Sequence, residues 1–306
     1  MNFRSQLRAI AQESFNERQD VYMLASAFII SLLAGLVIRD GMFYDYDHTK
    51  VGFFIVVCCA LWMGMFDSIL CICGKRDVLE RDKFSGLKPV PYLLACVVYQ
   101  AFHSILQSAV MCIVTALFVR WPSNTATLIV SPSFAYFFTV FLITFAAQML
   151  GLAVSSLLRT SEKALTFAPF LLIYELVMSE TIFGLPDALE PLRDTTIVRW
   201  GLNALGSAYD IDSLTWTAET KIHQMMSSFV DTVSSWLAPF GIDPATVGSF
   251  IASYQVDSSI MGVNHDLPEY AATAGHLGDM WIGLAALCLV GIVIAIAGFM
   301  RRIDMR

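Results

Sequence analysis

The amino-acid sequence predicts an all-α membrane protein of six transmembrane helices, with both ends of the chain in the cytosol. Of the 306 residues, 57% are hydrophobic and only 15% are charged, whereas soluble domains carry about 25% charged residues. A helix needs roughly 20 apolar residues to cross a bilayer. Six stretches approach or exceed that length: 21–38, 51–73, 91–119, 133–158, 164–184 and 280–300.

The distribution of lysine and arginine predicts the orientation of these helices. With the N-terminus inside, the cytosolic segments hold thirteen of the nineteen basic residues, as the positive-inside rule requires. Only 159–163 separates the fourth and fifth stretches, but its two cations are too costly to leave in hydrocarbon. We therefore expect four regions: a cytosolic amphipathic connecting helix at 1–20, transmembrane helices one to five at 21–184, an acidic helical extracytoplasmic domain at 185–279, and helix six with a basic cytosolic tail at 280–306.

Two of these regions leave alternatives open. Apolar residues at helical spacing, from Phe3 to Phe15, predict that the first helix either lies on the membrane surface or packs on other cytosolic parts. In 185–279, acidic residues far outnumber the three basic ones, while 222–237 and a start at Asp243-Pro244 have helical patterns. A solvated surface explains this acidity more simply than binding of a cationic substrate.

Motifs for catalysis, nucleotide binding and metal binding are missing from the sequence. Gly74-Lys75 lacks the upstream glycine of a phosphate-binding loop, and neither Gly-x-Ser-x-Gly nor His-Glu-x-x-His occurs. The seven cysteines lie in or beside apolar stretches, so we expect buried hydrophobes without disulfides or metal. A net charge of −7 disfavours a nucleic-acid partner. We expect this chain to be neither an enzyme nor a binder of any cofactor.

Residues 67–87 form the most informative stretch of the sequence. They read DSILCICGKRDVLERDKFSGL, so the cytosolic end of the second span runs into an elbow dense in both charges. A solvated loop that obeys the positive-inside rule would have this pattern, and so would a short helix that docks a cytosolic partner.

The stretch resembles the type-two permease family of ABC transporters, in its G-subfamily branch and bacterial relatives. The family pattern is roughly N-S-x-x-E-I-x-K-E-R-x-I-Y-x-R-E-R-x-x-G-L, which aligns without gaps from Asp67 to Leu87. Departures from the pattern include Asp67 for Asn, Cys71 for the first Glu and Lys75 for the second. Residues 151–164 with Pro169, and 199–205, are similar to two further family motifs in the right order.

The resemblance implies an ATP-driven mechanism in which this chain supplies the membrane path. A cytosolic ATPase carrying MgATP would bind the elbow and the 159–163 loop, and would come as a separate chain. A second six-helix permease half would complete a homo- or heterodimer. Reversal of both Arg76 and Arg81 to Glu should then uncouple hydrolysis from transport. The coupling residues implied are Lys75, Arg76, Asp77, Glu80, Arg81, Asp82, Lys83, Arg159, Glu162 and Lys163.

Polar residues inside the spans are candidates for the substrate pathway, because burying them in lipid is costly. In the family that this chain resembles, Gln tends to stand at the position of Glu175 and Gly at that of Glu180. This chain therefore carries an acidic side chain at two positions where its relatives have none. The polar face of the third span is explained at least as well by helix–helix hydrogen bonds, and we expect His103 to pair with Glu175. The pathway candidates are Asp67, Gln100, His103, Gln107, Glu175, Ser179 and Glu180.

These features predict the permease subunit of an ABC transporter, and export is favoured over import. The alternative is a non-transporting membrane scaffold or immunity protein that kept the permease fold. A membrane-embedded enzyme is a distant third, since no nucleophile–base or metal set is visible. We expect a multi-pass protein of the bacterial cytoplasmic membrane, since cysteines and Asn-x-Ser/Thr sites are missing from the external segments.

Overall fold

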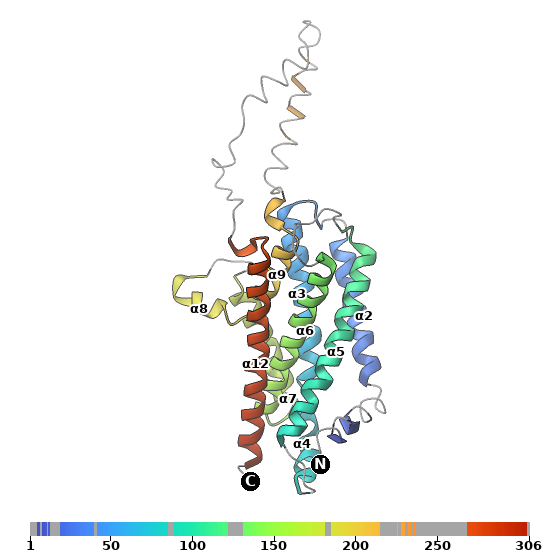
Figure 1. Cartoon of the computed structure of the whole chain (residues 1–306), viewed down its shortest axis with the longest axis vertical. Helices are drawn as coiled ribbons and strands as arrows, with labels where there is room; N and C mark the ends of the chain where they lie inside the picture. The colour runs from blue at the N-terminus through green and yellow to red at the C-terminus, as the bar shows by residue number, and fades with distance from the viewer. Residues whose placement is uncertain are drawn as a thin grey trace.

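The structure is a computed structural model, and its description covers part of the chain. The described residues are 5–6, 8–10, 12, 19–39, 42–84, 89–121, 131–180, 185–214, 225, 228–229, 232–233, 236 and 268–304. Within these ranges all regular structure is helical, as the sequence predicts. The membrane helices stand side by side in one bundle (Figure 1).

The principal helices are, in chain order, α2 (Gln19–Ile38), α3 (Tyr46–Ser68), α4 (Arg76–Phe84), α5 (Pro89–Phe118), α6 (Pro132–Leu157), α7 (Ser161–Met178), α8 (Glu190–Arg193), α9 (Ile197–Ala208) and α12 (Ala274–Asp304). In the described ranges, four short 3₁₀ turns lie between them: η1 (Cys73–Lys75), η2 (Asp187–Leu189), η3 (Ile211–Ser213) and η6 (Pro268–Tyr270).

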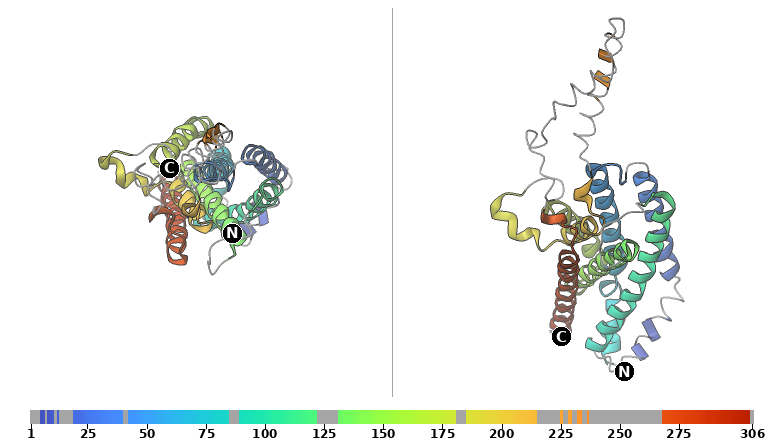
Figure 2. Two further views of the ribbon diagram at one scale, coloured as in Figure 1. Left: turned by 90° about the horizontal axis from the view of Figure 1, so that it is seen from above. Right: turned by 45° about the horizontal axis from the view of Figure 1, so that its top comes forward.

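Helix α6 forms the centre of the bundle. In its apolar window 72% of the residues are buried within the chain, against 28% for α2 and 33% for α12. Helices α3 and α12 both pack along α6, and α2 packs on α5. Viewed along the bundle, α2 and α5 form a pair on one side and α12 stands on the other (Figure 2). The outer helices are therefore the ones that present most apolar surface to lipid.

Local signals in the sequence set where the helices begin. Asp45 caps α3, since its carboxylate accepts a hydrogen bond from His48 N at 2.8 Å. Thr160 caps α7 in the same way, at 3.4 Å from Lys163 N. Helix α6 begins with Pro132 at its first position, where proline costs no hydrogen bond.

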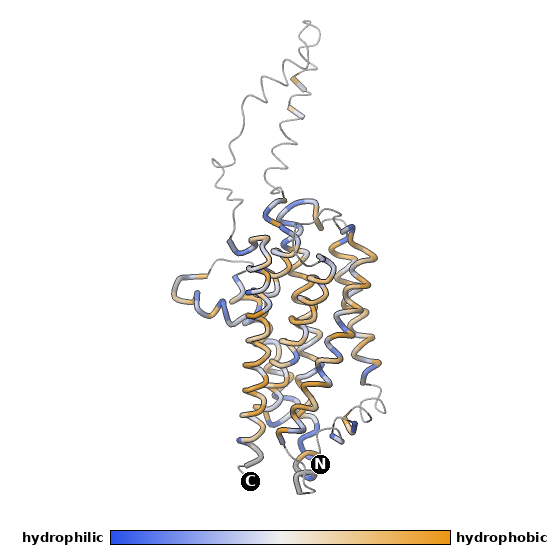
Figure 3. Tube along the Cα trace, in the orientation of Figure 1, coloured by the Kyte–Doolittle hydropathy of each residue, from blue (hydrophilic) through white to orange (hydrophobic). Residues whose placement is uncertain are grey.

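Five described helices are long and apolar enough to cross a membrane: α3, which is continued by the elbow, together with α2, α5, α6 and α12. Their middle portions are apolar and their ends are polar (Figure 3). They correspond to five of the six stretches expected. The last begins at Ala274 rather than near 280.

The remaining expected span, 164–184, corresponds to α7. This helix has 18 residues and carries Glu162, Lys163 and Glu175, so it differs from the five strongly apolar helices. Beyond it, α9 packs inside the bundle against α12, α6 and α3. The return from the elbow end to the far end is thus shared between two helices, α7 and α9.

Part of the segment expected to form an extracytoplasmic domain, helix α9, therefore lies inside the bundle. Ten of the twelve residues of α9 are buried, and its apolar and small side chains fill the space between α3, α6 and α12. The helix expected at 222–237 lies mostly, and the start at Asp243 wholly, outside the described residues. The same holds for most of the amphipathic helix expected at 1–20.

Candidate functional site: the charged elbow and the intramembrane polar cluster

The elbow that follows α3 is fastened to the end of α6. The hydroxyl oxygen of Ser155, in the last turns of α6, accepts hydrogen bonds from Ile72 N at 2.9 Å and Cys73 N at 3.0 Å. Ser155 is fully buried. One side chain thus satisfies two backbone donors in the segment that follows α3.

Arg76, at the start of α4, makes a second connection between the elbow and the end of α6. Its guanidinium donates to the carbonyl oxygen of Leu158 at 3.0 Å, and so caps the C-terminal end of α6. A Cβ placed on Gly74 would lie 3.8 Å from Ser161 Oγ in α7. The two segments expected to couple to an ATPase, 75–83 and 159–163, are therefore neighbours at one end of the bundle.

Charges of both signs are exposed on this end. Asp77 and Arg81 of α4 are exposed, as are Arg159, Glu162 and Lys163 of the neighbouring loop. Lys75 and Arg76 are half-buried. The side chains of Glu80, Asp82 and Lys83 lie outside the described part. This surface can dock a partner through complementary charges, which steer association and set its register.

Deeper in the bundle, polar side chains of α5 meet polar side chains of its neighbours. Gln107 donates to the Asp67 carboxylate of α3 and accepts from Gln148 Nε2 of α6 at 3.3 Å. Ser104 donates to the amide oxygen of Gln148. Gln148 is a member that the sequence analysis missed, because nothing in its own helix pattern marks it.

The same helix also contacts α2. His103 Nε2 lies 3.1 Å from Asp20 Oδ1, and the hydroxyl of Tyr99 donates to that carboxylate. Gln100, His103, Ser104, Gln107 and Ser108 are all buried, each at most 1% exposed. These contacts favour the helix–helix explanation for this polar face of α5, because they connect α5 to α2, α3 and α6.

Glu175 does not belong to this cluster, and the expected Glu175–His103 pair is wrong. Its carboxylate accepts from Ile197 N at 2.7 Å and Val198 N at 3.3 Å, the first two residues of α9. Thr196, at the N-cap position, makes no side-chain cap hydrogen bond. Glu175 therefore caps α9 from a different helix, where a carboxylate also suits the helix dipole.

Glu180 lies just past the end of α7 and forms an ion pair. Its carboxylate is 2.6 Å from Arg193 Nη1, and Arg193 also lies 3.5 Å from both Glu190 and Glu269. Glu180 has φ 60°, a left-handed conformation that glycine adopts at least cost. This backbone is compatible with the glycine that the resemblance implies at this position. The hydroxyl of Ser179 donates to Leu176 O at 2.8 Å, three residues earlier in the chain.

The Glu180–Arg193 pair predicts a loss of stability in acid. The hydrogen bond from Arg193 lowers the pKa of Glu180 below its ordinary value. A lowered pKa adds stability at neutral pH, which is lost as the pH falls through the pKa of the folded state. Between pH 7 and about pH 3.5, the free energy of unfolding of the wild type should fall further than that of Glu180→Gln, by about 1 kcal/mol or less. Equal pH dependence of the two proteins would contradict the pairing.

Together these features define a class: an integral, multi-pass helical membrane protein with a charged elbow braced against its central helix. Residues 5–205 match the family of ABC-2 type transporters. Because that match covers most of the chain, the protein belongs to the ABC-2 type transporter family. A curated relative, the ABC transporter ATP-binding/permease protein Rv1747 of Mycobacterium tuberculosis, is 26% identical over 157 residues, or 51% of this chain. The match spans 18% of that relative's length.

Proposed function

We propose that this chain is the permease subunit of an ATP-driven exporter in a bacterial cytoplasmic membrane. A separate cytosolic ATPase binds the elbow, and a second permease half completes the pathway. In this proposal α7 returns across the membrane with α9, so that the chain makes six passes with both ends inside. The name of the mycobacterial relative, which joins ATP-binding and permease functions, supports an ATPase as the partner.

The observation that carries this proposal is the bracing of the elbow. Helix α4 is too short and too charged to cross a membrane, yet Ser155 and Arg76 connect the elbow to the end of the most buried helix. A force applied to the exposed face of α4 would reach α6 through these hydrogen bonds. A coupling element needs such a connection to the membrane helices, whereas a loop that is merely solvated does not need one.

Charge reversal on this face should weaken ATPase binding. The probe is Asp77→Lys combined with Arg81→Glu, since both side chains are exposed. Arg76 is unsuitable, because Arg76→Glu would also remove the cap on Leu158. We expect the amount of ATPase that co-purifies with the chain to fall about tenfold, equivalent to about 1.4 kcal/mol.

A matched control carries the same two charge reversals at the other end of the bundle. Asp47→Lys with Arg120→Glu changes two exposed residues, one in the first turn of α3 and one just after the end of α5, and should leave ATPase recovery unchanged. Equal recovery from the elbow variant and the wild type would remove the docking assignment. A loss of recovery in both double variants would do the same.

A further inference from the structure

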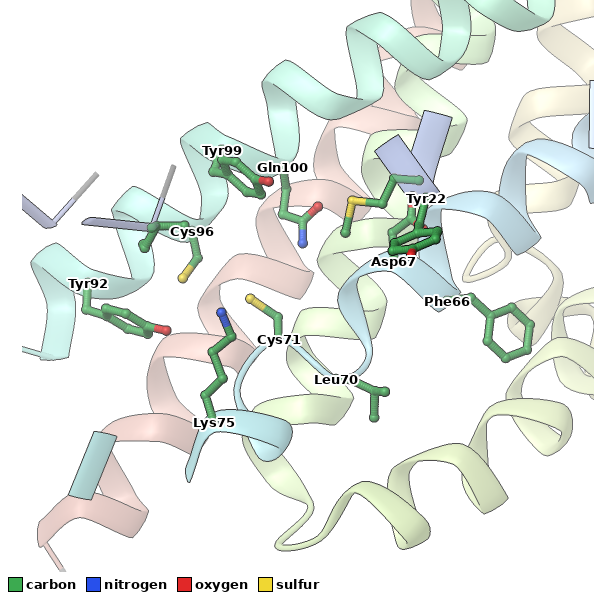
Figure 4. A pocket seen from close by; sticks show the side chains of 12 residues that line it. Tyr22, Phe66, Asp67, Leu70, Cys71, Lys75, Tyr92, Cys96, Tyr99 and Gln100 are labelled. Carbon is green, nitrogen blue, oxygen red and sulfur yellow. The ribbon is translucent and has the colours of Figure 1, made fainter. Parts of the chain in front are cut away.

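Two cysteines from different helices meet at the elbow end of the bundle. Cys71 follows α3, and Cys96 lies in α5; both line a cavity of about 280 Å³ between α2, α3 and α5. Their sulfur atoms point toward one another (Figure 4), and the two thiols are hydrogen-bonded. Twenty-five positions separate them in the chain, so the fold brings them together.

A cation and a hydroxyl group share the cavity with the two thiols. The ammonium of Lys75 extends into the same space, and the hydroxyl of Tyr92 points toward it (Figure 4). A cation beside a thiol stabilises the thiolate, which is the reactive form. Cys71 is half-buried whereas Cys96 is only 1% exposed, so a reagent that enters the cavity reaches Cys71 first.

The neighbouring cysteine, Cys73, is placed differently. It is buried, and its thiol donates to Ile69 O of its own segment at 3.3 Å. Cys112, also in α5, is half-buried and does not line this cavity. The seven cysteines, all within the described ranges, are present as thiols and not as disulfides.

We propose that Cys71 and Cys96 form a redox-active dithiol that hydroperoxides convert to an intramolecular disulfide. The Cys71 thiolate attacks one peroxide oxygen, the O–O bond breaks, and the leaving oxygen takes up a proton to become water. The Cys71 sulfenic acid is then attacked by the Cys96 thiol, the S–O bond breaks, and a second water leaves. Two thiols and one hydrogen peroxide thus give one disulfide and two waters.

The disulfide would change how the elbow is held. Cys71 comes two residues before η1, so a covalent bond to Cys96 fastens the start of the elbow to α5 in addition to α6. Reversible disulfides on the reducing side of a membrane are typically redox-sensing rather than structural. The site therefore suits a regulatory role in which oxidation to the disulfide restricts movement of the elbow. The dithiol itself does not depend on the proposed transport function.

Peptide mapping of the full-length wild-type chain tests the pairing directly. The chain, in detergent micelles, is treated with hydrogen peroxide, blocked with N-ethylmaleimide and digested without reductant. We expect a cross-linked pair of peptides containing Cys71 and Cys96, two hydrogens lighter than their sum and separated by dithiothreitol. The Cys112→Ser variant should give the same pair of peptides.

Single variants test the order of attack. Cys96→Ser should accumulate a sulfenic acid at Cys71 that dimedone traps, whereas Cys71→Ser should leave Cys96 open to maleimide after unfolding. Complete maleimide labelling of both cysteines in the peroxide-treated wild type would overturn the proposal. A disulfide that instead joins Cys73 to either residue would overturn it as well.

Discussion

Gly151→Ala is expected to destabilise the protein by about 1–3 kcal/mol, the usual cost of overpacking a tight interface. Helices α3 and α6 approach closely at this glycine: a Cβ there would lie 2.8 Å from Met65 O and 3.2 Å from Ile69 N, and would also clash with Ser68. Two of these three neighbours are backbone atoms, which cannot rotate away. Small residues of this kind allow membrane helices to pack closely.

The matched control is Gly278→Ala in α12, where a Cβ would meet nothing within 4 Å. Replacing a helical glycine with alanine in open space stabilises by up to about 1 kcal/mol. The two alanine variants should therefore shift the thermal unfolding midpoint in detergent in opposite directions. A midpoint for Gly151→Ala at or above that of the wild type would contradict the close packing of α3 on α6.

Glu175→Leu is expected to cost about 2–4 kcal/mol, because it leaves the buried N–H groups of Ile197 and Val198 without their acceptor. Glu175→Gln keeps an amide oxygen at that position and should cost less. Glu162→Leu removes an exposed carboxylate from the same helix, and should change stability by about 1 kcal/mol or less. Thermal unfolding of the three purified variants measures this ranking.

The ranking also separates two roles for Glu175. If the residue acts on substrate alone, the Leu and Gln variants should unfold at the temperature of the wild type while transport is lost. If it caps α9, as the geometry indicates, stability should fall most in the Leu variant. Equal midpoints for Glu175→Leu and the wild type would contradict the capping role.

Local patterns in the sequence were sufficient to predict five strongly apolar helices and the elbow. Apolar stretches and positive charges are local properties, so 51–73 and the cations at 75–83 could be read without knowing the fold. The charged boundary at 159–163 was likewise visible, and the structure places Thr160 there as the cap of α7.

Contacts between distant residues could not be predicted in this way. The partner of Glu175 lies 22 residues further along, in a helix that the sequence suggested was extracytoplasmic. The Arg76–Leu158 hydrogen bond spans 82 residues and ends on a backbone carbonyl, which carries no sequence signal. Gln148 lies in a mainly apolar helix, and only its neighbours show what it binds.

Site-specific photo-crosslinking in the native membrane tests the central claim, ATPase docking on the elbow, most directly. A photoreactive residue replaces Val78 of α4, which is 46% exposed, or Tyr44, which precedes α3 at the opposite end and is 63% exposed. Docking on the elbow predicts that the Val78 position gives a covalent adduct containing an ABC ATPase and that the Tyr44 position does not. An ATPase adduct from Tyr44, or none from Val78, would contradict the account.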